Sequence, residues 1–535
     1  METIETDILI IGGGGAGMRA ALTAKERGAE VLLASKTPIG KSTCTYLSGG
    51  AFSLAVEGMS QEGHLKATLQ AGRGINAPDL AKILVEEALE RVHELERLGL
   101  VGEWRKGRFF CLGTPPAWGA PLAKAMADAV KKQGISLLAW VMISDLLIEE
   151  GRAVGALGFD FQKGKFLAFA AKAIILANGG GGALYQRHDN PVRITGDGYA
   201  LAFHAGCHLR DMEFVQFIPP GVAEPGKPAI LIAPSLCDAG RVINSLGEDI
   251  LNKYQITEKP VAVRSRDLFS QAIFMEEAEG REVFLDLRGI SEEEWPRDNM
   301  AHTQRDLLRR NFSCSLKPIR ISPMCHHFMG GVMADPKGMT EIPGLFAAGE
   351  VVGGVHGANR MGGNALDEVL VFGHRAGESA AEWAREQVRK KGTGTLIQDR
   401  LRVLQGMARS SGKGLSPKAA RKMIGEILWK ESGILRDRKG LEGALDSLRR
   451  IRQEILPQMN AETPKEILEK MEVKNAILVG EMITRCALMR EESRGAHFRK
   501  DFPKTDDQKW RGNIFLKKTG DGMSLEFRPL PGKTS

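Results

Sequence analysis

The sequence predicts an α/β protein with a Rossmann-like dinucleotide-binding domain, an inserted α+β capping domain and a helical C-terminal domain. Three glycine-rich turns, each preceded by an apolar run, indicate the first domain; a polar, proline-rich stretch separates the last two turns; helical periodicity follows them. A chain of 535 residues has room for two to four such domains. We expect the boundaries 1–220 and 326–380 for the two parts of the dinucleotide-binding domain, 221–325 for the cap, 381–492 for the helical domain and 493–535 for a tail.

The N-terminus carries a β-α-β unit. The apolar run that ends at Ile11 predicts a buried strand, and a glycine turn, a helix over 18–27 and a second strand over 30–34 follow it. The turn contains G-x-G-x-x-G at Gly12, Gly14 and Gly17. The first glycine permits the tight turn, the second lets a pyrophosphate approach the backbone, and the third lets the helix pack on the strand. The N–H groups at the start of the helix then face the phosphates.

The second strand lacks the acidic residue that commonly binds the adenosine ribose, because it ends in Ser35-Lys36. The cofactor must therefore be held differently at this point. Two further strand–glycine turns occur at 171–180 and 342–350. Three distant turns at one site suit a long, extended dinucleotide, and FAD fits better than NAD.

The composition argues against several classes of protein. A net charge of +7 spread over the chain, with 6% aromatic residues and no aromatic-interleaved basic stretch, argues against nucleic-acid binding. We expect no membrane span and no secretory signal, since no apolar run is long enough and the N-terminus is acidic. The seven cysteines form no C-x-x-C pair. That argues against a disulfide framework or an iron–sulfur cluster held by this chain, predicts no metal site and fits a cytoplasmic location.

The later segments differ in character. The stretch 221–323 is polar and mixed, which favours a separate cap, and helical character begins after Gly373. Ser416-Pro417 is a helix start with proline at the first helical position. The apolar stripe at Leu441, Ala444, Leu445, Leu448 and Ile451 has helical spacing and indicates core packing. Trp510, Ile514 and Phe515 lie in short, strand-like runs of the tail.

Taken together, these motifs resemble the flavoprotein subunit of fumarate reductase and succinate dehydrogenase, a family that includes L-aspartate oxidase and adenylylsulfate reductase. The matching segments span nearly the whole chain. They are 11–19, 48–50, 195–198, 211–217, 265–267, 327–331, 356–366 and 493–499.

The resemblance implies bound FAD, hydride transfer between the flavin and a carbon beside a carboxylate, and in many members an iron–sulfur partner. Together with the glycine turns, it assigns the cofactor contacts to residues from all three turns and the segments between them. These are Gly12, Gly14, Gly15, Ala16, Gly17, Ser35, Lys36, Ser42, Thr43, Gly49, Gly50, Ala177, Gly179, Asp197, Glu350, Asn364, Ala365 and Leu366.

The resemblance also implies a substrate site. Arg266 matches the proton-donating arginine of the family, His326 its substrate histidine and Arg360 its carboxylate-binding arginine. A guanidinium is a poor acid at its usual pKa, so Arg266 must act in a dry site with a relay behind it. Asp238 and Arg241 have a spacing that suits this relay.

Two departures from the family pattern are informative. The family commonly has His-Pro-Thr-Gly where this chain has Ile218-Pro219-Pro220-Gly221. Two hydrogen-bonding side chains are lost, which predicts an acid with one free carboxylate and an apolar far end. Members with covalent FAD carry a histidine where this chain has Thr43. We therefore expect non-covalent FAD, with Cys44 as a small packed residue rather than a flavin attachment point.

The sequence thus predicts a cytoplasmic FAD-dependent oxidoreductase that reduces or forms a carbon–carbon double bond next to a carboxylate. Electrons would pass to or from a separate iron–sulfur protein, through which any membrane contact would be made. One alternative is an oxidase of the L-aspartate type, which the loss of His-Pro-Thr disfavours. Another is an electron-transferring flavoprotein subunit with no organic substrate, which the retention of Arg266 and Arg360 disfavours.

Overall fold

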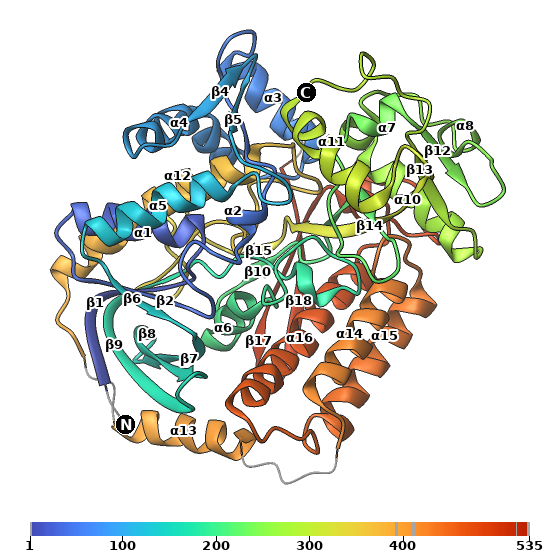
Figure 1. The fold of residues 1–535 in the computed structure, drawn as a ribbon. Helices are drawn as coiled ribbons and strands as arrows, with labels where there is room; N and C mark the ends of the chain where they lie inside the picture. The colour runs from blue at the N-terminus through green and yellow to red at the C-terminus, as the bar shows by residue number, and fades with distance from the viewer. Residues whose placement is uncertain (1–2, 391–393, 409–413, 521, 532–535) are drawn as a thin grey trace.

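The computed structural model describes residues 3–390, 394–408, 414–520 and 522–531 (Figure 1). Its first layer is a seven-stranded sheet in the order β6-β2-β1-β9-β8-β7, with β16 also paired to β9. The strands β1, β2, β6, β9 and β16 run parallel, and β8 and β7 form an antiparallel edge. Their bounds are β1 Thr3–Ile11, β2 Val31–Ser35, β6 Ser136–Ala139, β7 Val141–Glu149, β8 Arg152–Asp160, β9 Lys165–Leu176 and β16 Leu345–Ala347.

Helices pack closely against this sheet because small residues line their contacts. Helix α1 (Gly15–Glu26) packs on α12 (Asn364–Glu386), where a Cβ added at Gly377 would lie 2.4 Å from the carbonyl oxygen of Ala20. Helical structure thus begins at Asn364, earlier than the expected change after Gly373. The layer continues with α3 Gln61–Ala71, α4 Pro78–Arg97 and α5 Ala120–Lys132.

A small sheet stands beside this layer, in the order β3-β5-β4. Its strands are β3 Ala51–Ser53, β5 Arg108–Cys111 and β4 Gly102–Arg105, and the short helix α2 (Cys44–Leu47) precedes it.

The cap has its own sheet, in the order β11-β14-β13-β12, and its own hydrophobic core. The expected boundaries at 220/221 and 325/326 both fall within the long pair β11 and β14, which therefore connects the cap to the first domain. The bounds are β11 Val215–Val222, β12 Arg241–Asn244, β13 Val283–Asp286, β14 Ile319–Phe328, α7 Leu236–Ala239, α8 Ile250–Lys253, α9 Val261–Arg264, α10 Arg266–Ala278 and α11 Asn299–Phe312.

The C-terminal helices pack beside the cap (Figure 1, orange to red). Ser416 accepts a hydrogen bond from the N–H of Ala419, so the predicted helix start is confirmed. The predicted stripe is buried at Leu441, Ala444, Leu448 and Ile451, whereas Leu445 is partly exposed. The elements are α13 Gly394–Ala408, α14 Pro417–Glu431, α15 Arg438–Arg450, the single-turn segment η2 Ile451–Ile455 and α16 Pro464–Met489.

The tail returns to the first domain. Strand β17 (Gly512–Thr519) contains Ile514 and Phe515, as expected, while Trp510 ends the short helix α17 (Asp507–Trp510). The tail strands join the sheet β15-β10-β17-β18, so the end of the chain is tied to its middle. The other elements are η1 Gly182–Leu184, α6 Asp197–Ala205, β10 Leu209–Arg210, β15 Gly331–Val332 and β18 Gly522–Pro529. Among the described helices, none is long and apolar enough to cross a bilayer.

Candidate active site

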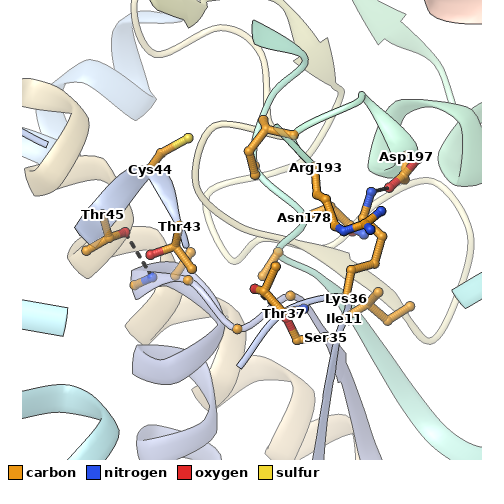
Figure 2. Close-up of a pocket in the computed structure, with 18 of the residues that line it drawn as sticks. Ile11, Ser35, Lys36, Thr37, Thr43, Cys44, Thr45, Asn178, Arg193 and Asp197 are labelled. Atoms are coloured by element: carbon orange, nitrogen blue, oxygen red, sulfur yellow. Dashed lines mark hydrogen bonds and ion pairs between the residues drawn. The ribbon is translucent and has the colours of Figure 1, made fainter. Parts of the chain in front are cut away.

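An open cavity lies at the carboxyl ends of β1, β2 and β9 (Figure 2). This is the edge of a parallel sheet at which dinucleotides bind. Most of the predicted cofactor contacts line it. They are Gly12, Gly14, Gly15, Ala16, Ser35, Lys36, Ser42, Thr43, Ala177, Gly179, Asp197 and Glu350.

The glycine turn is shaped for a close backbone approach. Gly12 has a φ of +128°, and a Cβ there would lie 2.1 Å from the carbonyl oxygen of Ala177. A Cβ at Gly14 would meet its nearest atoms only at 3.9 Å, which leaves space in front of the helix start. Nearby, the buried Oδ1 of Asn178 has no hydrogen-bond partner. An open cradle and a helix N-terminus fit the pyrophosphate of FAD, and the Asn178 oxygen can accept a hydrogen bond from one of the cofactor's hydroxyl or N–H groups.

Six predicted contacts do not line this cavity: Gly17, Gly49, Gly50, Asn364, Ala365 and Leu366. Gly17 instead allows α1 to pack, since a Cβ there would lie 1.9 Å from the carbonyl oxygen of Gly12. Asn364 is buried and hydrogen-bonds to His64 and Thr68. For Gly49, Gly50 and the start of α12, contact with a flavin stays a prediction.

Other residues of the cavity were not predicted. Thr37 and Asn178 adjoin predicted contacts in the chain, so the extent of the glycine turns could have indicated them. Strand β7 has no motif, and only the fold brings it here. The lining residues outside the predicted contacts are Ile11, Gly13, Ala34, Thr37, Cys44, Thr45, Val141, Met142, Ile143, Asn178, Arg193, Ile194, Ala348 and Val369.

Lys36 follows the second strand, where the fingerprint commonly has a ribose-binding acid. Its side chain pairs with two acidic residues. Its Nζ lies 2.5 Å from Asp197 Oδ2 and 2.9 Å from Glu472 Oε1, and it donates to Thr195 Oγ1 at 3.0 Å. Burial opposes its charge, but the two carboxylates raise the pKa of Lys36 overall. Because Glu472 lies on α16, this contact ties the helical domain to the dinucleotide site.

Arg266 is the first residue of α10 and is buried. Its Nε and Nη1 have no hydrogen-bond partner. Burial lowers the pKa of Arg266 to about 9, and repulsion from Arg360 adds to this. The positive end of the helix dipole disfavours the cation as well. Arg266 also lines a second, smaller cavity with Gln216, Phe217, Asn359 and Ile434.

Arg360 and His326 lie near Arg266, since the charges of both arginines lower the pKa of His326 after burial itself. Arg360 donates from Nη2 to Gln216 Oε1 at 3.0 Å and from Nη1 to Met361 O at 3.2 Å, and its buried Nε is unpaired. His326 Nδ1 lies 2.7 Å from Asp189 Oδ2, which favours its protonated form. The structure therefore brings the three predicted substrate residues together.

Comparisons with known proteins show the family of the chain. A family model described as "FAD binding domain" matches residues 7–366, and one described as "Fumarate reductase flavoprotein C-term" matches 421–535. The chain is 34% identical to a fumarate reductase (CoM/CoB) subunit of Methanothermobacter marburgensis, over 96% of this chain and 97% of that protein. It is 30% identical to L-aspartate oxidase of Streptomyces coelicolor, over 97% and 92% of the two.

A solved chain, a mutated FrdA of E. coli quinol fumarate reductase, superposes with a TM-score of 0.88 at 27% identity and covers 100% of this chain and 98% of that one. The chain belongs to the fumarate reductase/succinate dehydrogenase flavoprotein family. It is an FAD-dependent oxidoreductase. The predicted family, fold class and cofactor are thereby confirmed.

Two residues assigned to the proton relay of this flavoprotein lie elsewhere than the spacing suggested. Arg241 is exposed on β12, opposite Asp286 of β13. Asp238 lies on α7, and its Oδ1 accepts a hydrogen bond from the N–H of Val261, the first residue of α9. The described contacts link neither residue to the Arg266 guanidinium, so their relay role stays a prediction. Asp238 instead supports the short helix that precedes Arg266.

Ile218 is buried on β11, two residues after the glutamine that holds Arg360. It belongs to none of the hydrophobic core clusters. An apolar side chain thus stands where the family pattern has a polar one, and its effect on the substrate stays a prediction.

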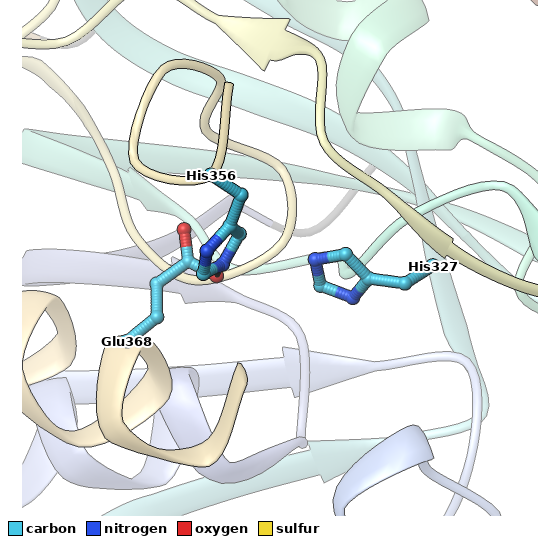
Figure 3. A group of neighbouring side chains, drawn as sticks. All are labelled: His327, His356 and Glu368. Atoms are coloured by element: carbon cyan, nitrogen blue, oxygen red, sulfur yellow. Dashed lines mark hydrogen bonds and ion pairs between the residues drawn. The ribbon is translucent and has the colours of Figure 1, made fainter. Parts of the chain in front are cut away.

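A group of buried titratable side chains adjoins both sites (Figure 3). His327, His356 and Glu368 have ligand-type atoms within 4.8 Å of one another, and His356 Nε2 lies 3.1 Å from Glu368 Oε2. His327 Nδ1 is 3.6 Å from Oε1 of Glu350, which lines the FAD cavity. Burial raises the pKa of Glu350 to about 7. The carboxyl group of Glu350 therefore gains or loses its proton near pH 7.

Proposed function

We propose that this flavoprotein reduces, or in reverse forms, a carbon–carbon double bond next to a carboxylate. The observation that supports this most directly is Arg266, a buried cation without a hydrogen-bond partner among the described residues whose pKa of about 9 suits a proton donor. Arg360 and His326 are cationic or hydrogen-bonding groups that can hold the carboxylate beside it.

When bound, FAD supplies the flavin ring that exchanges hydride with a substrate carbon. The chain's own residues do the rest. Arg360, oriented by Gln216, fixes the carboxylate; His326, oriented by Asp189, adds a second donor; and Arg266 delivers a proton to the neighbouring carbon. The polar neighbours of Arg360 and His326 fix their positions in advance, so little reorganisation is needed on binding.

We propose non-covalent FAD, because Thr43 replaces the attachment histidine. Burial raises the pKa of the Cys44 thiol well above its usual value, and its Sγ donates to Asn190 Oδ1 at 3.3 Å. A protonated thiol is a weak nucleophile, so it does not attack the flavin. Acid precipitation should leave the yellow colour in the supernatant, and colour retained by the pellet through a denaturing gel would contradict this.

The electron partner is proposed to be a separate iron–sulfur protein. The seven cysteines form no C-x-x-C pair of the kind that commonly holds a cluster, and six of them are buried. The relative of Methanothermobacter marburgensis is itself named as one subunit of its enzyme.

The test is an anaerobic assay with a reduced dye as electron donor and a panel of unsaturated mono- and dicarboxylates. Dye oxidation dependent on one of these acids, with the saturated acid as product, is the expected result. Oxidation of L-aspartate with oxygen as the acceptor, and no reduction of any unsaturated acid, would favour the oxidase instead. Co-purification with an iron–sulfur protein tests the partner separately.

A further inference from the structure

Arg108 is a cation of the small sheet that faces the substrate arginines. Strand β5 pairs with β3 so that Arg108 lies opposite Ser53, and opposite residues of an antiparallel pair project from the same face. Ser53 donates from Oγ to Gly362 O at 2.7 Å and from its backbone N–H to Asp367 Oδ2 at 3.2 Å. The Arg108 side chain therefore leaves the sheet toward Gly362 and Asp367.

The Arg266 guanidinium lies on this same side, next to Gly362. A Cβ added at Gly362 would lie 3.7 Å from Nη2 of Arg266. The charge of Arg108 contributes to the lowered pKa of Arg266, and Asp367 is close enough to interact with both Arg108 and Arg360. Three arginines from three separate segments thus surround one region.

These arginines have carboxylates in their surroundings, such as Asp189 near Arg266 and Arg360, but few direct partners. In the described part of the chain, the Arg108 guanidinium makes no hydrogen bond and no ion pair, and Arg266 and Arg360 keep unpaired buried nitrogens. Asp367 gives its Oδ2 to Ser53, and burial raises the pKa of this carboxyl well above its usual range, which weakens it as a counter-charge. Open guanidinium nitrogens in a partly buried site are costly, so an anionic ligand that pairs with them would bind favourably.

We propose that Arg108 is a specificity-determining residue of the substrate site, where it holds a second negatively charged group of the substrate. This inference rests on the proposed function and sharpens its substrate. The segment Ile218–Gly221 by itself predicts one carboxylate and an apolar far end, but Arg108 supplies from another strand the polar contact that this segment lacks. Its planar fork can grip a carboxylate in bidentate fashion.

The experiment compares two acids of the same carbon skeleton with the FAD-loaded enzyme: fumarate, which has two carboxylates, and crotonate, in which a methyl group replaces one. Both are assayed for reduction and for binding, the latter by the change in flavin absorbance. The variants are Arg108→Gln, Arg108→Lys and, as the matched control, Arg105→Gln. Arg105 lies opposite Arg108 on β4, but it pairs with Glu103 and stacks on Phe110.

We expect Arg108→Gln to weaken fumarate binding and kcat/KM about 10- to 100-fold, the usual loss for one hydrogen-bonded charge, while crotonate changes much less. Arg108→Lys should fall between the two, and Arg105→Gln should match the wild type. Equal losses for both acids, no loss for either, or a wild type that binds neither or prefers crotonate would each overturn the proposal.

The FAD content of each variant reports folding, and Arg108→Lys keeps the test open if Arg108→Gln does not fold. Binding separates this inference from the proposed function. Selective loss of dianion binding in a protein that reduces neither acid would support the role of Arg108 and refute the reaction.

Discussion

Two regions of this molecule hold buried arginines and treat them in opposite ways. In the tail, Arg490 contacts Glu213 and Glu492 and two backbone carbonyls, Arg494 contacts Glu492 and Asp507, and Arg499 forms a bidentate pair with Asp501. Every guanidinium nitrogen of these three has a partner. At the substrate site, Arg266 has none and Arg360 keeps an open Nε.

The difference separates a structural use of charge from a functional one. A buried cation without a partner destabilises the fold, so it persists only where something else requires it. In the tail, the ion pairs tie β17 and the end of α16 to the first domain. At the proposed substrate site, Arg266 and Arg360 keep open nitrogens, as we expect of cations that bind an anionic substrate.

The largest expected effect is on turnover at the substrate site. Arg266→Gln should lower the reduction rate by a factor of about 10²–10⁴, the usual contribution of a positioned acid. It should leave FAD binding intact and the melting temperature unchanged or higher, because an unpaired buried cation is removed. The measurements are steady-state kinetics and thermal unfolding of the same preparation. A variant that keeps more than about a hundredth of the wild-type rate would refute the assignment of Arg266.

The same type of substitution in the tail should do the reverse. Arg490→Met leaves Glu213 buried without its cation, while Glu492 keeps Arg494, and the loss should cost about 3–5 kcal/mol of stability. The molecules that remain folded should keep their turnover per bound FAD. Arg449→Met is the control, because that arginine forms only an exposed pair with Asp446 and should leave the melting temperature nearly unchanged. If folded Arg490→Met lost its turnover, the claim that Arg490 has only a structural role would be wrong.

The two regions should also respond to opposite ends of the pH range: the reduction rate should fall at high pH, and the stability of the tail at low pH. Arg266 must be protonated to donate, and its pKa is about 9, so kcat/KM for reduction should fall as pH rises through 9. In the tail, the hydrogen bond from Arg499 lowers the pKa of Asp501 to about 2 in the folded state. That stabilisation is present above the ordinary pKa of about 4 and is lost as pH falls from there to 2. Kinetics and circular dichroism across pH measure the two effects. A kcat/KM that stays constant through pH 9 in a folded protein would contradict the assignment of Arg266.

Local motifs could be predicted from the sequence, whereas contacts between distant segments could not. The glycine turn at Gly12 is local, because strand, turn and helix are contiguous. The steric reason for Gly17 lies within this segment, at the carbonyl oxygen of Gly12, whereas the close contact at Gly12 comes from the distant Ala177. Arg266, Arg360 and His326 were recognised only because each sits in a motif that resembles the family.

Arg108 could not be predicted in this way. It reaches the site through the pairing of β5 with β3, a long-range contact that no local pattern encodes. The same limit explains Lys36, whose carboxylate Glu472 comes from the distant helix α16. Asp238 and Arg241 illustrate the converse: a plausible spacing along the chain did not place an exposed Arg241 beside Arg266. Charge pairing is decided by tertiary contacts, so its presence or absence is the least predictable feature of this site.

The smallest expected effect comes from restoring the polar group that the Ile218 position lacks. In the wild type, Ile218→His should raise fumarate turnover only slightly, by about 3-fold or less, if Arg108 already satisfies the second carboxylate. In an Arg108→Gln background, the same histidine should give about 10-fold, because it then supplies a contact to an otherwise unpaired charged group. The difference between the two gains is a coupling energy that a double-mutant cycle measures directly. A large gain in the wild type would mean that Ile218, and not Arg108, determines the substrate preference. The expected substrate would then be the acid with one carboxylate and an apolar far end that the sequence predicts.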